Sequence, residues 1–158
     1  MNRIDMVGDV KRYPKLNQVP IVFMGEYIEN DPLVILQSVL SDGYNCVLVD
    51  SFAEVAVAVV DYHGGTMKNA ETKILNILEQ HNQGNNQNKF NTSFMLIQHV
   101  TKGGEFAGSN RFKHMLTGMA HMKFNADGDR KIYFSKNRRC VEMNALYFSL
   151  TSANHVVW

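Results

Sequence analysis

The sequence predicts an α/β fold with a parallel sheet first and antiparallel strands at one edge near the C-terminus. Two observations predict this fold. Across residues 20–98, short apolar runs alternate with stretches of helical periodicity. Strand-like runs then follow one another, and the first two of them meet at Ala126-Asp127-Gly128-Asp129, a strong hairpin turn. The 158 residues suit one domain, and a hydrophobic content of 45% is enough for a core.

The first two elements lie within residues 20–43. Residues 20–25 are apolar and bounded by Pro and Gly, which predicts a short buried strand. Asn30-Asp31-Pro32 then predicts a helix start, with Asp31 as the cap and Pro32 at the first helical position. Leucines recur at helical spacing after it, and Asp42-Gly43 ends the helix.

A second buried strand is predicted from Cys46 to Val49, ending at Asp50-Ser51. Cys46 and Cys140 form no metal-binding spacing, so we expect Cys46 to be a buried free thiol. Residues 52–60 are apolar and fit either a helix or a strand, and His63-Gly64-Gly65 ends them.

The rest of the chain continues the same alternation and then changes to strands. Helical spacing predicts a helix over 70–81, and the Asn, Gln and Gly content of 82–91 predicts a solvated helix end and loop. The remaining predicted elements are a buried strand over 93–98, a short helix over 109–117, and strands over 119–125, 130–135 and 146–150.

Composition excludes some classes of function. The net charge of +1 gives no global field for nucleic acid, although basic residues gather in the C-terminal half. Such a cluster is also typical of an ordinary solvated surface. No apolar run reaches the roughly 18 residues of a membrane helix, and no signal pattern is present, so we expect a soluble, cytoplasmic protein that binds no membrane.

Polar residues follow two of the predicted strands. Asp50 stands at the carboxyl end of its strand, where open α/β sheets bind ligands and where a carboxylate can hold Mg²⁺ beside phosphates. Gln98 and His99 end the next strand, where a polar pair can sense a terminal phosphate. Structural roles compete in both places: Asp50 could cap the next element, and the Gln98-His99 pair could bond to the loop backbone.

Residues 94–138 carry an ordered set of motifs. An apolar run ends in Gln98-His99, a loop with Val100-Thr101-Lys102-Gly103-Gly104 and Ala107-Gly108 follows, and Lys136-Asn137-Arg138 comes after a strand. The set resembles the C-terminal half of the RecA-type ATPase core, most closely the bacterial RadA (Sms) branch and its phage relatives. The resemblance implies a RecA-like, mostly parallel sheet flanked by helices, truncated at the N-terminus and antiparallel near the C-terminus. Residues 1–158 would then be one partial core domain.

The resemblance also implies a nucleotide site. Asp50 resembles the Walker B carboxylate that holds Mg²⁺ through water, with Ser51 beside it at the ATP, and Gln98 and His99 take catalytic roles next to it. Lys136 and Arg138 resemble the basic pair that reaches the nucleotide of a neighbouring subunit, as an arginine finger does. The chain departs from the family after this triplet, where Arg139-Cys140 replaces Phe-Gly.

The same resemblance implies contact with DNA. The loop from Thr101 to Asn110 corresponds to a DNA-facing loop, so Lys102, Arg111 and Lys113 are candidate phosphate contacts. The expected partner is single-stranded or branched DNA, bound weakly and without sequence preference. A plain flexible surface loop is the competing interpretation.

The phosphate-binding half of the family core is missing from the sequence. Walker A, G-x-x-x-x-G-K-[ST], occurs nowhere, and there is no Gly-Lys pair. We therefore expect no ATP hydrolysis by this chain alone, and its status as an enzyme stays open. It could be half of a split ATPase completed by a separate polypeptide carrying Walker A, a fragment, or a non-catalytic DNA-binding or oligomeric assembly module. Exposed sheet edges predict a homo-oligomer.

Overall fold

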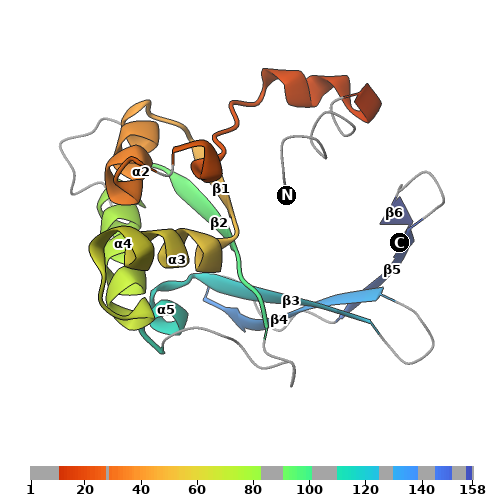
Figure 1. Cartoon of the computed structure of the whole chain (residues 1–158). Coiled ribbons are helices and arrows are strands. Elements are labelled where there is room, and N and C mark those ends of the chain that lie inside the picture. The colour runs from red at the N-terminus through yellow and green to blue at the C-terminus, as the bar shows by residue number, and fades with distance from the viewer. Residues whose placement is uncertain are drawn as a thin grey trace. The chain divides into compact units, whose positions relative to one another are not determined.

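The structure is a computed structural model that describes residues 11–27, 29–82, 91–100, 110–124, 130–138, 145–150 and 156–157 (Figure 1). It is a mixed α/β protein that divides into two compact units, Met1–Ser109 and Asn110–Trp158. The first unit holds a two-stranded parallel sheet and the second a four-stranded antiparallel sheet. Among the described residues, no helix combines the length and apolar character needed to cross a membrane.

In the described part of the first unit, the helical residues Lys11 and Arg12 come before two short 3-10 helices, η1 (Pro14–Gln18) and η2 (Met24–Tyr27). The strand predicted over residues 20–25 is wrong, because 20–23 are irregular and η2 begins at Met24. Ile21 and Val22 are also exposed. A strand needs a neighbouring backbone to bond with, and within the described residues β1 (Cys46–Asp50) and β2 (Ser93–Ile97) pair only with each other.

Helix α2 (Pro32–Ser41) begins and ends where the sequence predicts. The carboxylate of Asp31 accepts a hydrogen bond from the backbone N–H of Leu33 at 2.9 Å, and Pro32 occupies the first helical position. Gly43 follows the helix with φ 80°, a left-handed conformation that favours glycine.

Strands β1 and β2 pair in parallel and are connected through two helices, α3 (Phe52–His63) and α4 (Met67–Asn82). The ambiguous segment 52–60 is therefore helical. Gly64 and Gly65, with φ of 70° and 94°, separate the two helices. The sheet is not mostly parallel, because β1 and β2 are the only strands that pair in parallel in the part of the chain that the structure describes.

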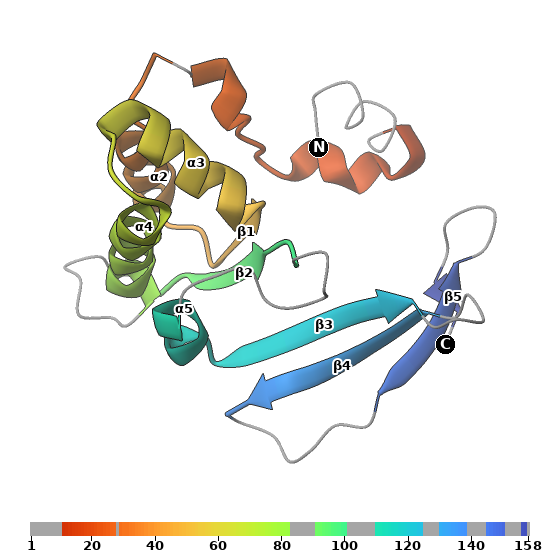
Figure 2. The same cartoon turned by 60° about the horizontal axis from the view of Figure 1, so that its bottom comes forward.

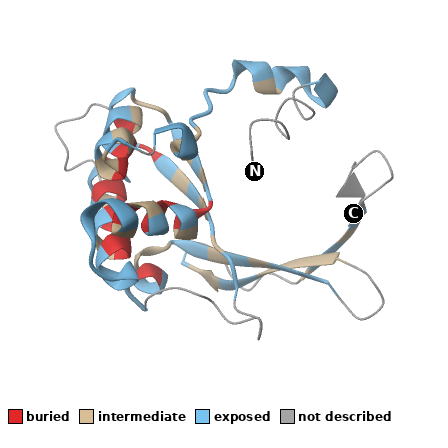
Figure 3. Cartoon of the chain, in the orientation of Figure 1, coloured by how far each residue is buried: buried red, intermediate tan, exposed pale blue. Residues whose placement is uncertain are grey.

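The core of the first unit lies between its helices. Figure 3 shows the buried residues gathered on α2, α3 and α4, which pack against one another. Burial of these side chains supplies the main stabilising free energy of the unit. The buried hydrophobic residues of the three helices are Leu36, Leu40, Phe52, Val55, Ala56, Val59, Ala70, Ile74, Leu75, Ile77 and Leu78.

The prediction that the two parallel strands are buried is wrong. Exposed residues alternate with partly buried ones along each strand. The register pairs Cys46 with Ser93, Leu48 with Met95 and Asp50 with Ile97, so these six residues share one exposed face, here called the open sheet face. Leu48 is 57% exposed and Met95 62%. The prediction of a buried Cys46 is wrong because its side chain lies on this face.

The second unit contains α5 (Asn110–Met115) and an antiparallel sheet in the order β3-β4-β5-β6. Figure 2 shows β3 and β4 side by side as long neighbouring strands. The predicted short helix and three strands are confirmed. The predicted turn residues 126–129 lie outside the described residues, but the flanking pair Phe124 and Arg130 faces across the hairpin. The strands are β3 (Gly118–Phe124), β4 (Arg130–Asn137), β5 (Leu146–Leu150) and β6 (Val156–Val157).

Candidate functional site

The predicted nucleotide-site residues of the first unit meet at the carboxyl edge of the parallel pair. Asp50 lies directly opposite Ile97 in the register of β1 and β2. Asp50-Ser51 and Gln98-His99 therefore leave the same edge of the sheet on neighbouring strands. This is the edge at which open α/β sheets bind ligands.

The four residues at this edge differ in their exposure. Asp50 and His99 are exposed, Gln98 is intermediate with a buried Oε1 atom, and Ser51 is buried. The Ser51 hydroxyl accepts a hydrogen bond from the backbone N–H of Glu54 at 3.4 Å, which caps α3. Ser51 thus orients the start of α3, while the Asp50 carboxylate faces solvent.

A magnesium ion bound with a nucleotide takes one or two protein carboxylates and otherwise phosphate oxygens and water. One exposed carboxylate at the strand end, that of Asp50, meets this requirement. Within the described ranges, no group of three or more His, Cys, Asp or Glu side chains could hold a metal ion.

Lys136 and Arg138 belong to the second unit, where both reach the C-terminal end of α5. The Lys136 ammonium donates to the carbonyl oxygens of Lys113 and His114, and the Arg138 guanidinium also donates to that of His114. The last carbonyls of a helix have no intrahelical partner and carry partial negative charge, so they attract cations. Partial desolvation and the nearby Arg138 charge lower the pKa of Lys136.

The predicted DNA contacts are only partly within the described chain. Lys102 lies outside the described residues. Arg111 and Lys113 are on α5, and both are exposed. The described structure therefore does not bring these three residues together. Lys113 lies close enough to His121 for its charge to lower the His121 pKa.

The sheet of the second unit holds polar and aromatic residues that the sequence analysis did not single out. His121 and Tyr133 face each other across β3 and β4, with ring centroids 5.1 Å apart and planes at 14°. The His121 Nε2 atom lies 2.6 Å from the Ser135 hydroxyl. Partial burial, followed by the charges of Lys123 and Lys113, lowers the pKa of His121. The strand-like alternation of side chains over residues 119–125 and 130–135 was the sequence signal that could have identified these residues.

The charges of the chain are divided unevenly between the two units. Residues 110–158 contain eight Lys and Arg and three Asp and Glu, a net charge of +5. Residues 1–109 contain eight basic and twelve acidic residues, a net charge of −4. The overall charge of +1 therefore conceals a strongly basic unit, which is the composition that nucleic-acid partners favour.

Comparison of the chain with family models, curated proteins and solved structures gave no match. The resemblance of residues 94–138 to the RecA-type core accordingly stays a prediction from sequence.

Proposed function

We propose that this chain is a RadA-like relative of the RecA-type ATPase core and supplies part of a Mg²⁺-ATP site used in DNA recombination or repair. The observation that carries the proposal is the shared edge of β1 and β2, where Asp50 stands beside Gln98-His99. Two strand-end polar pairs on adjacent parallel strands suit a bound phosphate chain and its cation.

Each residue has a role in this proposal. Asp50 holds the Mg²⁺ ion through water, and Ser51 orients the neighbouring helix start. Gln98 and His99 contact the terminal phosphate and relay its loss to the following loop. Lys136 and Arg138 act on the nucleotide of a neighbouring copy, which requires them to leave the α5 carbonyl oxygens they contact here.

The chain lacks Walker A, so a separate polypeptide completes the site in this proposal. Calorimetry with Mg²⁺-ATP tests it, first on the full chain alone and then on the chain mixed with a RadA-type polypeptide that carries Walker A. We expect no heat from the chain alone and binding from the mixture beyond that of the partner. Asp50→Asn should remove the gain, while Asp61→Asn, an exposed carboxylate on α3, should not. Binding by the chain alone, or no gain in the mixture, would contradict the proposal.

A second candidate function is a non-catalytic DNA-binding or oligomeric assembly module. The charge of the second unit favours it, because a net +5 is concentrated in residues 110–158. Binding of single-stranded DNA that is unaffected by nucleotide would support this alternative. Binding that depends on Mg²⁺-ATP and the Walker A partner would favour the ATPase.

A further inference from the structure

Five residues of the antiparallel sheet share one face. His121 lies opposite Tyr133, Lys123 lies opposite Lys131, and Lys131 in turn lies opposite Tyr147 of β5. Residues directly opposite each other in a sheet project to the same side, and residues two apart along a strand do as well. We call this set the lysine–tyrosine face.

The two lysines of this face surround an aromatic ring. The ammonium groups of Lys123 and Lys131 each lie 5.9 Å from the centroid of the Tyr133 ring, which is also stacked with His121. Tyr147, the next aromatic residue on the face, is 55% exposed. The face therefore combines accessible aromatic surface with positive charge.

Two positive charges on this face repel each other and so destabilise the sheet. Like charges directly opposite on neighbouring strands repel, and Lys123 and Lys131 are such a pair. The described residues of the second unit include no Asp or Glu that could offset them. An anion placed over the pair would relieve this repulsion.

The opposite face of the sheet has a different chemical character. Met122, Phe124, Phe134 and Leu146 alternate with the lysine–tyrosine face along the three strands, and all four are apolar and exposed. Arg130 also lies on that side, with its guanidinium carbon 5.2 Å from the centroid of the Phe124 ring. The lysine–tyrosine face differs in that its two basic residues, Lys123 and Lys131, lie directly opposite each other beside one ring.

We propose that the lysine–tyrosine face binds single-stranded nucleic acid. Bases stack on Tyr147 and on the accessible part of the Tyr133 ring, while Lys123 and Lys131 contact the phosphates between them. Aromatic platforms beside basic side chains bind single strands in this way without reading sequence. The inference rests on the nucleic-acid part of the proposed function and places it on strands β3 to β5 rather than on Lys102, Arg111 and Lys113.

Fluorescence anisotropy of a labelled oligo(dT) of roughly 16 nucleotides, with the full chain, tests the inference. Tyr147→Ala should weaken binding by about tenfold, whereas Tyr147→Phe, which retains the ring, should leave it unchanged. Tyr62→Ala, which removes a similarly exposed tyrosine from α3, is the matched control. Circular dichroism of each variant confirms that the sheet is intact.

The lysines have a separate signature in the salt dependence. Lys123→Gln with Lys131→Gln should reduce the slope of log K against log salt by roughly 1.4, since each single-strand phosphate contact contributes about 0.7. Lys68→Gln with Lys73→Gln on α4 removes the same charge and should not change the slope. Tyr147→Ala should lower affinity without altering the slope.

The outcomes separate this inference from the proposed function. If only Arg111→Gln with Lys113→Gln weakens binding, the inference is overturned while DNA binding through those residues stands. If inorganic polyphosphate competes fully and Tyr147→Ala has no effect, the face binds phosphate without stacking, and the inference is again overturned. If the wild type binds no oligonucleotide, both nucleic-acid proposals fail, and the Mg²⁺-ATP experiment still decides the nucleotide site.

Discussion

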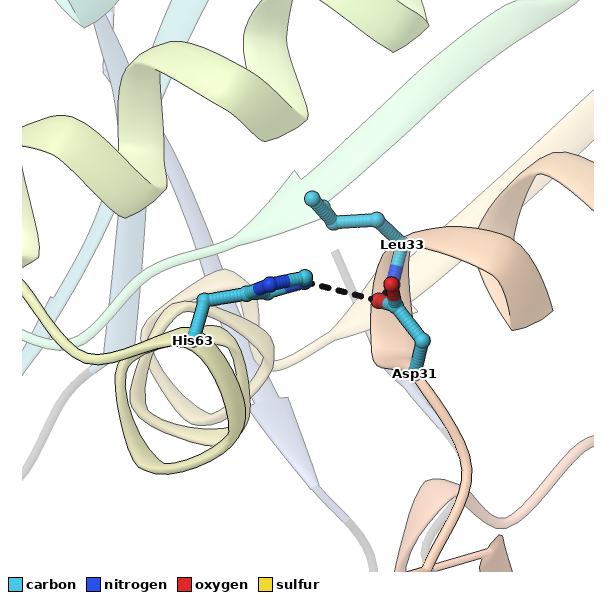
Figure 4. Close-up of polar contacts among 3 residues, drawn as sticks. All are labelled: Asp31, Leu33 and His63. Carbon is cyan, nitrogen blue, oxygen red and sulfur yellow. Dashed lines mark hydrogen bonds and ion pairs between the residues drawn. The ribbon is translucent and has the colours of Figure 1, made fainter.

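The Nε2 atom of His63 lies 2.9 Å from the Oδ1 atom of Asp31, linking the last residue of α3 to the N-terminal cap of α2 (Figure 4). The same Oδ1 atom accepts the Leu33 N–H at 2.9 Å. Asp31 therefore combines a local role as a helix cap with a contact 32 positions away in sequence. This pair ties together two of the three helices that form the core.

Replacing Asp31 should destabilise the first unit measurably. Asp31→Ala removes both hydrogen bonds, and loss of an N-cap typically costs about 1 kcal/mol. Urea unfolding followed by circular dichroism measures the change. Asp31→Asn retains a capping oxygen and should lose less, and Asp61→Ala on α3 makes the same change in charge without the cap. A loss no larger in Asp31→Ala than in Asp61→Ala would contradict the assigned role.

The contribution of Asp31 should also depend on pH. Burial alone raises the pKa of Asp31, but hydrogen bonds from Leu33 and His63 outweigh it, so the pKa lies below its ordinary value. A carboxylate with a lowered folded-state pKa stabilises the fold above its unfolded pKa and loses that contribution as pH falls through the folded value. The stability difference between wild type and Asp31→Asn should shrink as pH falls below about 4, where the Asp31 carboxylate takes up a proton. A difference that does not shrink in that range would contradict the lowered pKa.

The sequence predicted correctly those helix boundaries that depend on residues acting on the adjacent backbone. The cap and end of α2 follow from Asp31, Pro32 and Gly43, each of which acts on the backbone next to it. The predictions of a strand over residues 20–25 and of a buried Cys46 were wrong. Both depend on what the segment packs against, and its amino-acid composition does not reveal that. The shared edge of Asp50 and Gln98 depends on two strands becoming neighbours, and the lysine–tyrosine face depends on the register of a hairpin.

The open sheet face should promote self-association. It exposes Leu48, Met95 and Ile97 on a sheet that has only two strands in the described chain, and contiguous exposed apolar surface and unpaired edges favour contacts between copies. Light scattering at micromolar concentration should give a mass above that of one chain. Met95→Gln with Leu48→Thr should lower it. Val34→Thr, which changes an exposed apolar residue of α2, is the control, and a monomeric wild type would rule out this association.

The thiol of Cys46 offers an independent probe of the same face. Because Cys46 is exposed, a maleimide should label it in the native Cys140→Ser variant, and adding Cys46→Ser should remove that labelling. Labelling should slow as protein concentration rises if copies associate through the open sheet face. Reaction of Cys46 only after denaturation would show that the face is covered.

Lys136 and Arg138 should stabilise α5 whether or not they also act on a nucleotide. Their side chains donate to the carbonyl oxygens of Lys113 and His114, at the end of a helix of only six residues. So short a helix is not stable by itself, and cations at its C-terminus favour it. Lys136→Ala with Arg138→Ala should therefore speed amide hydrogen exchange in α5, and Lys136→Gln, which retains a donor, should have a smaller effect. Lys68→Ala on α4 should leave exchange in α5 unchanged. If the double variant exchanges as slowly as the wild type, these contacts do not hold the helix, and both side chains are free to serve a neighbouring subunit at no cost to α5.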